Sequence, residues 1–204
     1  MKEIRAFNFE VRAEENEEHG HFLTGQPIVY NERTDLGWYD EIIDNNALAE
    51  TDLRDVRFLV NHNTDMIPLA RSRNNNANST MQMEVRENIG MSIRVDLDTE
   101  NNTDSRNLYS AVGRGDISGM SFMFIVDEDS WEDIDSDHPT RHIRSISRVL
   151  EVSAVTFPAY EATSIQTRGL AEALESAKAS LDSVKSVKAE LERRKQKIRI
   201  LTEV

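Results

Sequence analysis

The stretch Gly115-Asp-Ile-Ser-Gly-Met-Ser-Phe-Met-Phe124 combines a glycine-rich turn with an apolar run. Glycine lets the backbone bend sharply or approach another chain closely, and such an apolar run is typical of a strand entering a sheet. Two hydroxyls, those of Ser118 and Ser121, lie inside it. Because they are three positions apart, they face opposite sides of a strand, and only one of them can line a given pocket.

Two further stretches on either side of this one carry chemically active groups. Phe58-Leu-Val-Asn-His-Asn63 is a short apolar strand that ends at His62. Arg148-Val-Leu-Glu-Val-Ser-Ala-Val-Thr-Phe-Pro-Ala-Tyr160 places Glu151 in a largely apolar strand. The three stretches thus supply an imidazole, a hydroxyl and a carboxylate, in that chain order. Serine proteolysis needs these groups, because a hydroxyl is a poor nucleophile until a base takes its proton.

The bulk composition narrows the classes of function. The 204 residues suit one domain plus an appendage, and the chain has no cysteine, which excludes disulfides, cysteine proteases and Cys-ligated zinc. A formal net charge of −13 argues against nucleic acid as a main partner. Because the sequence contains no long apolar stretch, we expect no signal peptide, no membrane span and synthesis in a cytoplasm.

The three stretches together resemble the prohead proteases of tailed bacteriophages. The family pattern is an Asn-His after an apolar strand, then Gly-x-x-x-Gly-Met-Ser-Phe, then Glu-x-Ser-x-Val-x-x-Pro-Ala. This chain has Asn61-His62, Gly115 to Phe122 and Glu151 to Ala159, within a resemblance that covers roughly residues 20 to 165. It departs from the pattern at Met123 and at Ala70, two positions where the family often has Gly. Neither departure removes a catalytic group, but both bear on the shape of the pocket. The resemblance implies a β-barrel fold shared with the herpesvirus assemblins.

The expected site residues are Ser121 as nucleophile, His62 as base and Glu151 as the group that orients the base. Ser121 is preferred over Ser118 because it takes the family position before Phe122. The stretch is not a nucleophile elbow, since Met123 stands where that motif needs Gly. Alternative interpretations are a strand hydroxyl for Ser121, a surface loop residue for His62 and a salt bridge to Arg148 for Glu151. His142 is the rival third member, because assemblins use a second histidine there.

No metal or cofactor is expected. The histidines lack a spacing such as His-x-x-x-His. The acidic run from Asp127 to Asp137 is compatible with calcium by composition, but it lacks the Gly and the terminal Glu of an EF-hand loop. We interpret it as a solvated loop near the active site.

The expected fold class is α+β, a mainly antiparallel β-barrel with a few flanking helices and a C-terminal amphipathic helix. Strands are expected at 7–13, 21–30, 56–60, 142–146 and 149–156, with a hairpin across 81–97. A short helix is expected from Asn45 through Leu53, and another from Thr103 or Asp104 to about Val112. The expected domains are 1–168 for the protease barrel and 169–204 for a helical tail.

The tail differs from the body in charge and in pattern. From Gly169 onward there are 8 basic against 6 acidic residues, whereas the remainder has 16 against 31. Apolar residues recur every seven positions, and two lysines interrupt the second seam late in the helix. The pattern predicts that the tail binds a partner helix with moderate affinity. The basic cluster Arg193-Arg-Lys-Gln-Lys197 favours an acidic partner.

The resemblance implies a serine endopeptidase inside the immature capsid, in the host cytoplasm. Its implied partners are the scaffolding segment of the major capsid protein and the protease itself, through autoprocessing, with possible self-association through the helix. The alternative function is a non-enzymatic scaffolding protein that acts through its C-terminal helix. Ser121 with His62 discriminates between the two, since a scaffold needs neither. A third class, a small-molecule-binding barrel, would want an apolar cavity, of which the acidic loops give no sign.

Overall fold

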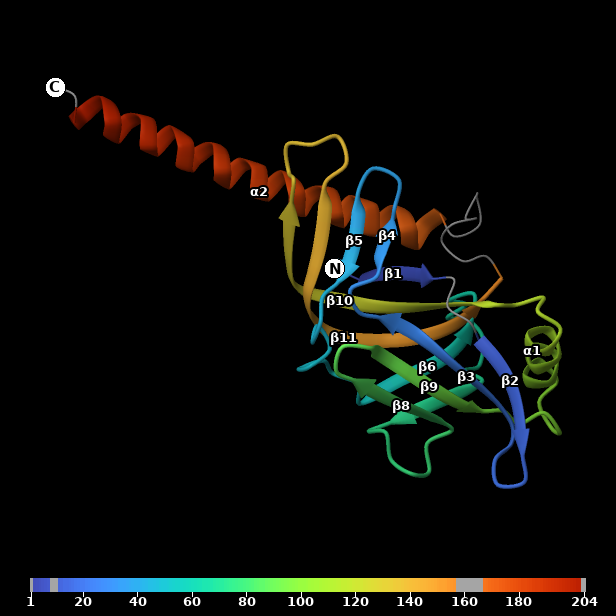
Figure 1. The fold of residues 1–204 in the computed structure, drawn as a ribbon. Coiled ribbons are helices and arrows are strands. Elements are labelled where there is room, and N and C mark those ends of the chain that lie inside the picture. The colour runs from blue at the N-terminus through green and yellow to red at the C-terminus, as the bar shows by residue number, and fades with distance from the viewer. Residues whose placement is uncertain (1, 8–10, 157–166, 203–204) are drawn as a thin grey trace.

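The computed structural model describes residues 2–7, 11–156 and 167–202. Strands dominate these ranges, two α-helices accompany them, and the class is α+β (Figure 1). In chain order the elements are β1 Lys2–Phe7, β2 Val11–Asn16, β3 Gly20–Val29, β4 Arg33–Asp35, β5 Asp40–Ile43, β6 Asp55–Val60, β7 Ala70–Arg73, β8 Met81–Arg86, β9 Gly90–Asp96, α1 Thr103–Gly113, β10 Gly119–Glu132, β11 Thr140–Val155 and α2 Thr167–Thr202.

The strands form two sheets. The larger has the order β1-β10-β11-β5-β4, and the smaller has the order β2-β3-β9-β8. The long strand β11 lies antiparallel to β10 and parallel to two short strands, β5 near its start and β6 near its end. Strand β7 then pairs with β6 at an edge of the larger sheet. Strands β6, β11 and β10 therefore lie side by side, which brings the segments with His62, Glu151 and Ser121 to one region.

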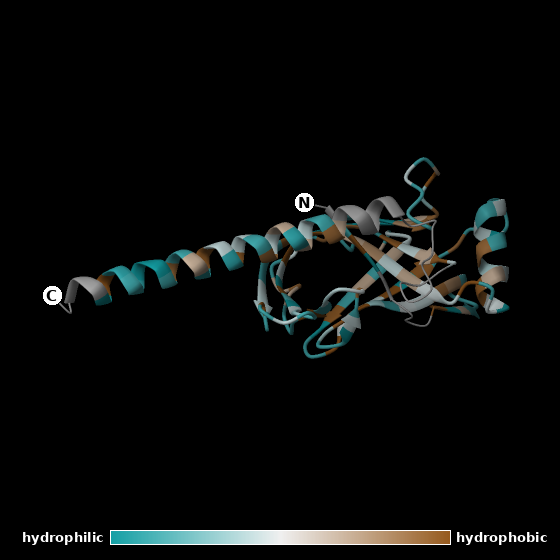
Figure 2. Ribbon diagram, turned by 90° about the horizontal axis from the view of Figure 1, so that it is seen from above, coloured by the Kyte–Doolittle hydropathy of each residue, from teal (hydrophilic) through white to brown (hydrophobic). Residues whose placement is uncertain are grey.

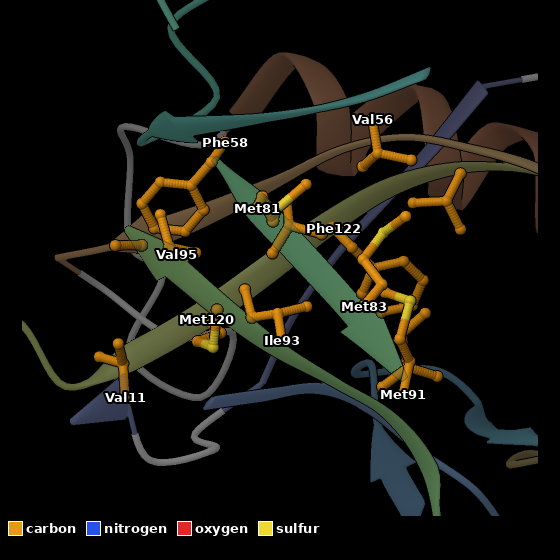
Figure 3. Close-up of a cluster of buried hydrophobic side chains, with 14 of the residues drawn as sticks. Val11, Val56, Phe58, Met81, Met83, Met91, Ile93, Val95, Met120 and Phe122 are labelled. Carbon is orange, nitrogen blue, oxygen red and sulfur yellow. The ribbon is translucent and has the colours of Figure 1, made fainter. Parts of the chain in front are cut away.

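The hydrophobic core lies between the two sheets. Figure 3 shows Phe58, Met120 and Phe122 of the larger sheet against Met81 and Val95 of the smaller one, and the core cluster contains all five. Within the described residues no ladder joins the two sheets, so the α+β class is confirmed but the closed barrel is not. Contact across this core is what holds the strands of the site in register.

A buried ion network anchors the N-terminal strand. Glu3 and Arg5 of β1, Glu41 of β5 and Arg141 of β11 are each at most 2% exposed. Arg5 Nη2 donates to Glu3 Oε2 and to Glu41 Oε2, both at 2.6 Å, and Arg141 Nη1 donates to Glu3 Oε2 at 2.8 Å. Burial lowers the pKa of the Arg5 guanidinium, but Glu41, Tyr39 and Glu3 together raise it by more, so Arg5 remains charged.

Helix α2 packs on the body with its first half and extends from it with its second. Ala173 and Ala177 are fully buried, Leu181 is nearly so, and Ser176 Oγ donates to Glu3 Oε1 at 3.0 Å. The distal half is exposed, and Figures 1 and 2 show it projecting well beyond the sheets. The division into 1–168 and 169–204 stays a prediction, but the buried residues tie the start of the helix to β1.

Several expected elements differ from the observed ones. Residues 45–50 form turns rather than a helix, with Asn46 at φ 66°. The two last strands are one continuous strand, β11, and the first part of the acidic run belongs to β10. Helix α1 is capped by Asn102, whose side chain accepts from the backbone N–H groups of Asp104 and Ser105. The expected strand at 7–13 falls partly on residues 8–10, outside the described ranges.

Among the described residues, no helix has the length and apolar character needed to cross a bilayer.

Candidate active site

The hydroxyl of Ser121 lies on β10 in the interior of the larger sheet. The residue is fully buried, and it pairs with Ala6 of β1 on one side and with Ser153 of β11 on the other. Its Oγ lies 2.5 Å from His62 Nε2 and 2.6 Å from the backbone carbonyl oxygen of Arg5. Ser118 is exposed in the turn before the strand, so the two hydroxyls occupy different environments.

The turn that follows β6 carries His62. Asn61 and His62 have φ values of 51° and 55°, and the N–H of Asn63 donates to the carbonyl of Val60 at 3.1 Å. Two successive left-handed residues in one tight turn are the pattern of a type I′ turn, which Asn tolerates and His adopts at a cost of about 1–3 kcal/mol. The turn directs the imidazole from the end of β6 towards β10.

Hydrogen bonds to the end of β11 hold this turn. The N–H of Asn61 donates to Ala154 O at 3.0 Å. The side chain of Asn61 accepts from the N–H of Thr156 at 2.9 Å and donates to Thr156 Oγ1 at 3.1 Å. The N–H of His62 donates to Ser153 Oγ at 3.1 Å. These contacts offset the strain of the turn and fix the position of the imidazole.

The carboxylate of Glu151 is buried and fully engaged. One oxygen, Oε1, forms a short contact with His62 Nδ1, and the other, Oε2, accepts from Ser153 Oγ at 2.6 Å. The residue is 3% exposed, so an unpaired charge would be costly there. Arg148, the partner considered for a salt bridge, lies near Asp52 instead, with 3.7 Å between Nε and Oδ2.

The rival histidine lies elsewhere. His142 Nδ1 lies 2.8 Å from Asp44 Oδ1, and His142 pairs in register with Ser130. It precedes Glu151 by nine positions on β11, or about 30 Å along an extended strand. The structure therefore brings Ser121, His62 and Glu151 together and leaves His142 in a separate contact with Asp44.

The proton inventory of the three groups fits one tautomer. With Nδ1–H directed at the Glu151 carboxylate, Nε2 presents a lone pair to the Ser121 hydroxyl. That hydroxyl has one proton and two acceptors, His62 Nε2 and Arg5 O. When the imidazole is protonated, Nε2–H donates to Oγ, and Oγ–H donates to Arg5 O. The backbone of β1 can therefore accept a hydrogen bond from the hydroxyl when His62 Nε2 cannot.

Two contributors were missed by the sequence reasoning. Ser153 contacts both Glu151 and His62, and its position two residues after Glu151 on a strand places both side chains on one face, which is a signal that the sequence contains. The carbonyl of Arg5 gave no sequence signal, because any residue has one. It reaches Ser121 only through the pairing of β1 with β10.

One group of residues among those described has the spacing of metal ligands. Asp35, Asp40 and His138 lie at the start of β5 and its surroundings, and His138 Nε2 is 3.0 Å from Asp40 Oδ1. Asp35 and His138 are exposed, and the contact between His138 and Asp40 is an ordinary side-chain hydrogen bond near the surface. We assign no metal to this group, and the absence of a cofactor stays a prediction.

A hydroxyl, an imidazole and a carboxylate in hydrogen-bond sequence on a strand-rich scaffold are the arrangement that serine hydrolases use. Comparison with protein families matches residues 7–178 to the caudovirus prohead serine proteases. The match covers most of the chain, and the chain belongs to this family. It is a serine protease of capsid maturation. This family membership decides against the alternative function of a non-enzymatic scaffolding protein. Comparison with curated proteins and with solved structures gave no match.

Proposed function

We propose that Ser121, His62 and Glu151 are the catalytic residues of this protease. The observation that carries the proposal is the unbroken chain of contacts from Glu151 through His62 Nδ1 and Nε2 to Ser121 Oγ. Ser121 Oγ attacks the scissile carbonyl carbon while its proton passes to His62 Nε2. The imidazolium then gives that proton to the leaving amine, and an acyl-enzyme is left.

The second half of the reaction uses the same groups. Water attacks the acyl carbon, His62 Nε2 takes the proton of that water, and the collapse of the intermediate returns a proton to Ser121 Oγ. Glu151 keeps the proton of the neutral imidazole on Nδ1 and stabilises the imidazolium that forms in each half. Ser153 holds Glu151 in place and also accepts the N–H of the His62 backbone, so it acts as a positioning residue.

The proposed substrates are the scaffolding segment of the major capsid protein and the protease chain itself. Membership of the prohead family supports action on capsid protein inside a prohead. The assignment of these two particular substrates rests on the sequence resemblance. The projecting half of α2 suits recruitment into the prohead, because it carries exposed Val187, Leu191 and Ile198 beside a basic cluster. We propose that it binds an acidic partner helix, in the scaffolding segment or in another copy of the protease.

Incubation of purified capsid protein with the protease, read by mass spectrometry, tests the assignment of the nucleophile. The wild-type protein should release the scaffolding segment, and Ser121→Ala should reduce the rate by about 10⁴-fold or more, because the covalent step is lost. Ser118→Ala is the matched control and should cleave at the wild-type rate. Full activity in Ser121→Ala would remove Ser121 from the mechanism.

A further inference from the structure

The proposed nucleophile is closed off from solvent. Ser121 is 0% exposed, and Ser153 and Glu151 beside it are at most 3% exposed. The side chain of His62, which contacts Ser121 from the turn after β6, is 9% exposed. A scissile carbonyl carbon must come within about 3–3.5 Å of Ser121 Oγ, and a fully buried hydroxyl leaves no room for it. A segment beside Ser121 must therefore move before a polypeptide binds.

Three segments contact Ser121 in the described part of the chain, and one of them lies at an edge. Strand β11 carries Glu151 and is enclosed between β10 and β6, and the turn after β6 carries His62. Strand β1 ends the larger sheet, pairs with β10 alone and supplies none of the three proposed catalytic side chains (Figure 1). It lies almost wholly before residue 7, where the family match begins. The departure of β1 would thus open the site and leave the catalytic groups in place.

Strand β1 holds a peptide backbone where an extended substrate would lie. It runs antiparallel to β10, with Ala6 opposite Ser121 and Ile4 opposite Met123. The carbonyl oxygen of Arg5 lies 2.6 Å from Ser121 Oγ, so a backbone carbonyl already stands next to the nucleophile. A polypeptide that replaced β1 would form the same ladder with β10, by strand addition to the freed edge.

The contact with β1 also competes with the base for the hydroxyl proton. A carbonyl oxygen can only accept, so Ser121 Oγ–H donates to Arg5 O. His62 Nε2 lies 2.5 Å from the same Oγ, and this contact is then a hydrogen bond only when Nε2 carries a proton and donates it. A protonated imidazole cannot act as the base for Ser121. The closed arrangement therefore opposes the first chemical step as well as the binding of substrate.

We propose that β1, Lys2–Phe7, is an intramolecular latch: it covers Ser121 in the closed state, and cleavage requires it to leave β10 so that an extended polypeptide pairs there. This rests on the proposed function, because it takes Ser121 as the nucleophile. The buried contacts of Glu3 and Arg5 with Arg141 and Glu41 hold the latch closed. The rate is then proportional to the fraction of molecules in which the latch is open.

A reversible cross-link between β1 and β10 tests the latch. Ile4 and Met123 are half-buried and opposite each other. Opposed residues of antiparallel strands have Cα atoms about 4.5–5.5 Å apart, which is within the range that a disulfide spans. The chain has no cysteine, so Ile4→Cys/Met123→Cys would form one defined bridge. Both cysteines are smaller than the residues they replace, so the bridge adds no bulk beside Ser121.

The measurement is kcat/KM for a synthetic peptide that spans the capsid-protein cleavage site. We expect the reduced double variant to cleave it at close to the wild-type rate. The oxidised form should be slower by about 100-fold or more, because a bridged β1 cannot leave β10, and dithiothreitol should restore the rate. The matched control is Gln82→Cys/Arg94→Cys, which bridges β8 to β9 in the smaller sheet and should be equally active in both redox states.

A second variant loosens the latch. Glu3→Gln removes the carboxylate that accepts from Arg5 and Arg141, and it leaves the three proposed catalytic residues unchanged. A purely structural role for Glu3 would leave kcat/KM unchanged or lower it, whereas a weakened latch opens more often. We expect kcat/KM to rise by about 10-fold in Glu3→Gln at a temperature where circular dichroism shows it folded.

Three outcomes would overturn the latch. The first is an oxidised Ile4→Cys/Met123→Cys enzyme as fast as its reduced form, and the second is an equal loss in the oxidised control bridge. The third is a folded Glu3→Gln enzyme with kcat/KM at or below the wild-type value. Failure of the proposed function gives a different pattern, in which the wild-type protein leaves the peptide intact or Ser121→Ala still cleaves it.

Discussion

Ser153 shows how one hydroxyl can join two parts of the proposed catalytic site. Its Oγ donates to Glu151 Oε2 and accepts the N–H of His62, so the same atom fixes the carboxylate and the turn that carries the base. The residue is fully buried, and water therefore does not replace either bond when the hydroxyl is removed. A small change at this position should act on the chemistry as well as on the fold.

We predict that Ser153→Ala lowers kcat by about 10–100-fold and leaves KM nearly unchanged. The loss of a buried hydrogen bond costs about 1–3 kcal/mol, and here it leaves the imidazole of His62 less firmly oriented towards Ser121. Steady-state kinetics would measure both constants on a synthetic peptide that spans the capsid-protein cleavage site mapped by mass spectrometry (the mapped peptide). Ser145→Ala, on the same strand but away from the site, is the control. Ser153→Thr, which keeps the hydroxyl, should recover part of the rate, and a wild-type kcat in Ser153→Ala would show that the two bonds are only structural.

Residue types together with the family motifs led to Ser121, His62 and Glu151, and the structure places these three in contact. Their chain order and the family motifs were enough to select them, because each motif names its active residue. The support around them was harder to foresee. The left-handed pair Asn61 and His62 depends on the hydrogen bonds to Thr156 and Ser153, and these exist only because β6 lies beside β11.

A buried ion network fixes strand β1 in addition to its pairing with β10. Glu3 and Arg5 face the interior, where an amphipathic strand would carry apolar side chains, so the alternation of residue types hid the strand from the sequence. The same strand supplies the carbonyl that contacts Ser121 and supports the first half of α2. The ion network is therefore an element-scale link between the N-terminus, the nucleophile and the helix.

We predict that the stability difference between wild type and Glu3→Gln shrinks as the pH falls. Burial raises the pKa of the Glu3 carboxyl, but Arg5, Arg141 and Ser176 together lower it by more, so the net pKa lies below the ordinary value of 4.5. A lowered folded-state pKa gives stability that is fully present above about pH 4.5 and is lost as the pH falls through the folded-state pKa.

Urea unfolding between pH 7 and pH 3 would measure this difference. At pH 7, Glu3→Gln should be less stable by about 3–5 kcal/mol, because the two guanidinium groups lose a buried partner. Glu84→Gln, which removes an exposed carboxylate, is the control and should change stability little. A difference that stays constant from pH 7 to pH 3 would show that the Glu3 charge does not stabilise the fold.

Elements with strong alternation were predictable, and elements shaped by charge pairing were not. The expected strand at 56–60 and the hairpin across 81–97 are found as β6 and as β8 with β9. The acidic run looked like a solvated loop, yet Asp129 accepts from Arg141 Nε at 2.7 Å and from Ser180 Oγ at 2.9 Å. These partners come from β11 and α2, so neither local propensity nor periodicity could reveal that β10 continues to Glu132.

At the scale of the whole molecule, α2 divides into a bound half and a projecting half. The bound half buries Ala173, Ala177 and Leu181 and ends near the ion pair of Lys188 with Asp135. The projecting half extends from the body as a single helix (Figure 2), and only one of its two apolar seams continues along it. The tail expected from the sequence at residue 169 thus contains a packed contact in its first half, and a sequence pattern cannot distinguish the two halves because both are amphipathic.

Two truncations separate these halves. A chain that ends at Ala189 should fold, cleave the peptide at the wild-type rate and fail to be packaged into proheads. A chain that ends at Arg168 should be less stable by about 3–5 kcal/mol, because it loses the burial of one leucine and two alanines. Circular dichroism would measure folding and stability, peptide cleavage would measure activity, and a packaging assay would measure recruitment into proheads. Normal packaging of the chain that ends at Ala189 would place recruitment elsewhere, and a fully stable chain that ends at Arg168 would make 1–168 an independent domain.

The central claim is that Glu151, His62 and Ser121 act as one catalytic unit, and the most direct test is a double-variant cycle on the last two. The measurement is kcat/KM for the mapped peptide with the wild-type enzyme, Ser121→Ala, His62→Ala and the double variant. Members of one unit lose their effect together, so we predict that the double variant is scarcely slower than either single variant. Losses that multiply in the double variant would show that His62 does not serve Ser121 and would contradict the mechanism.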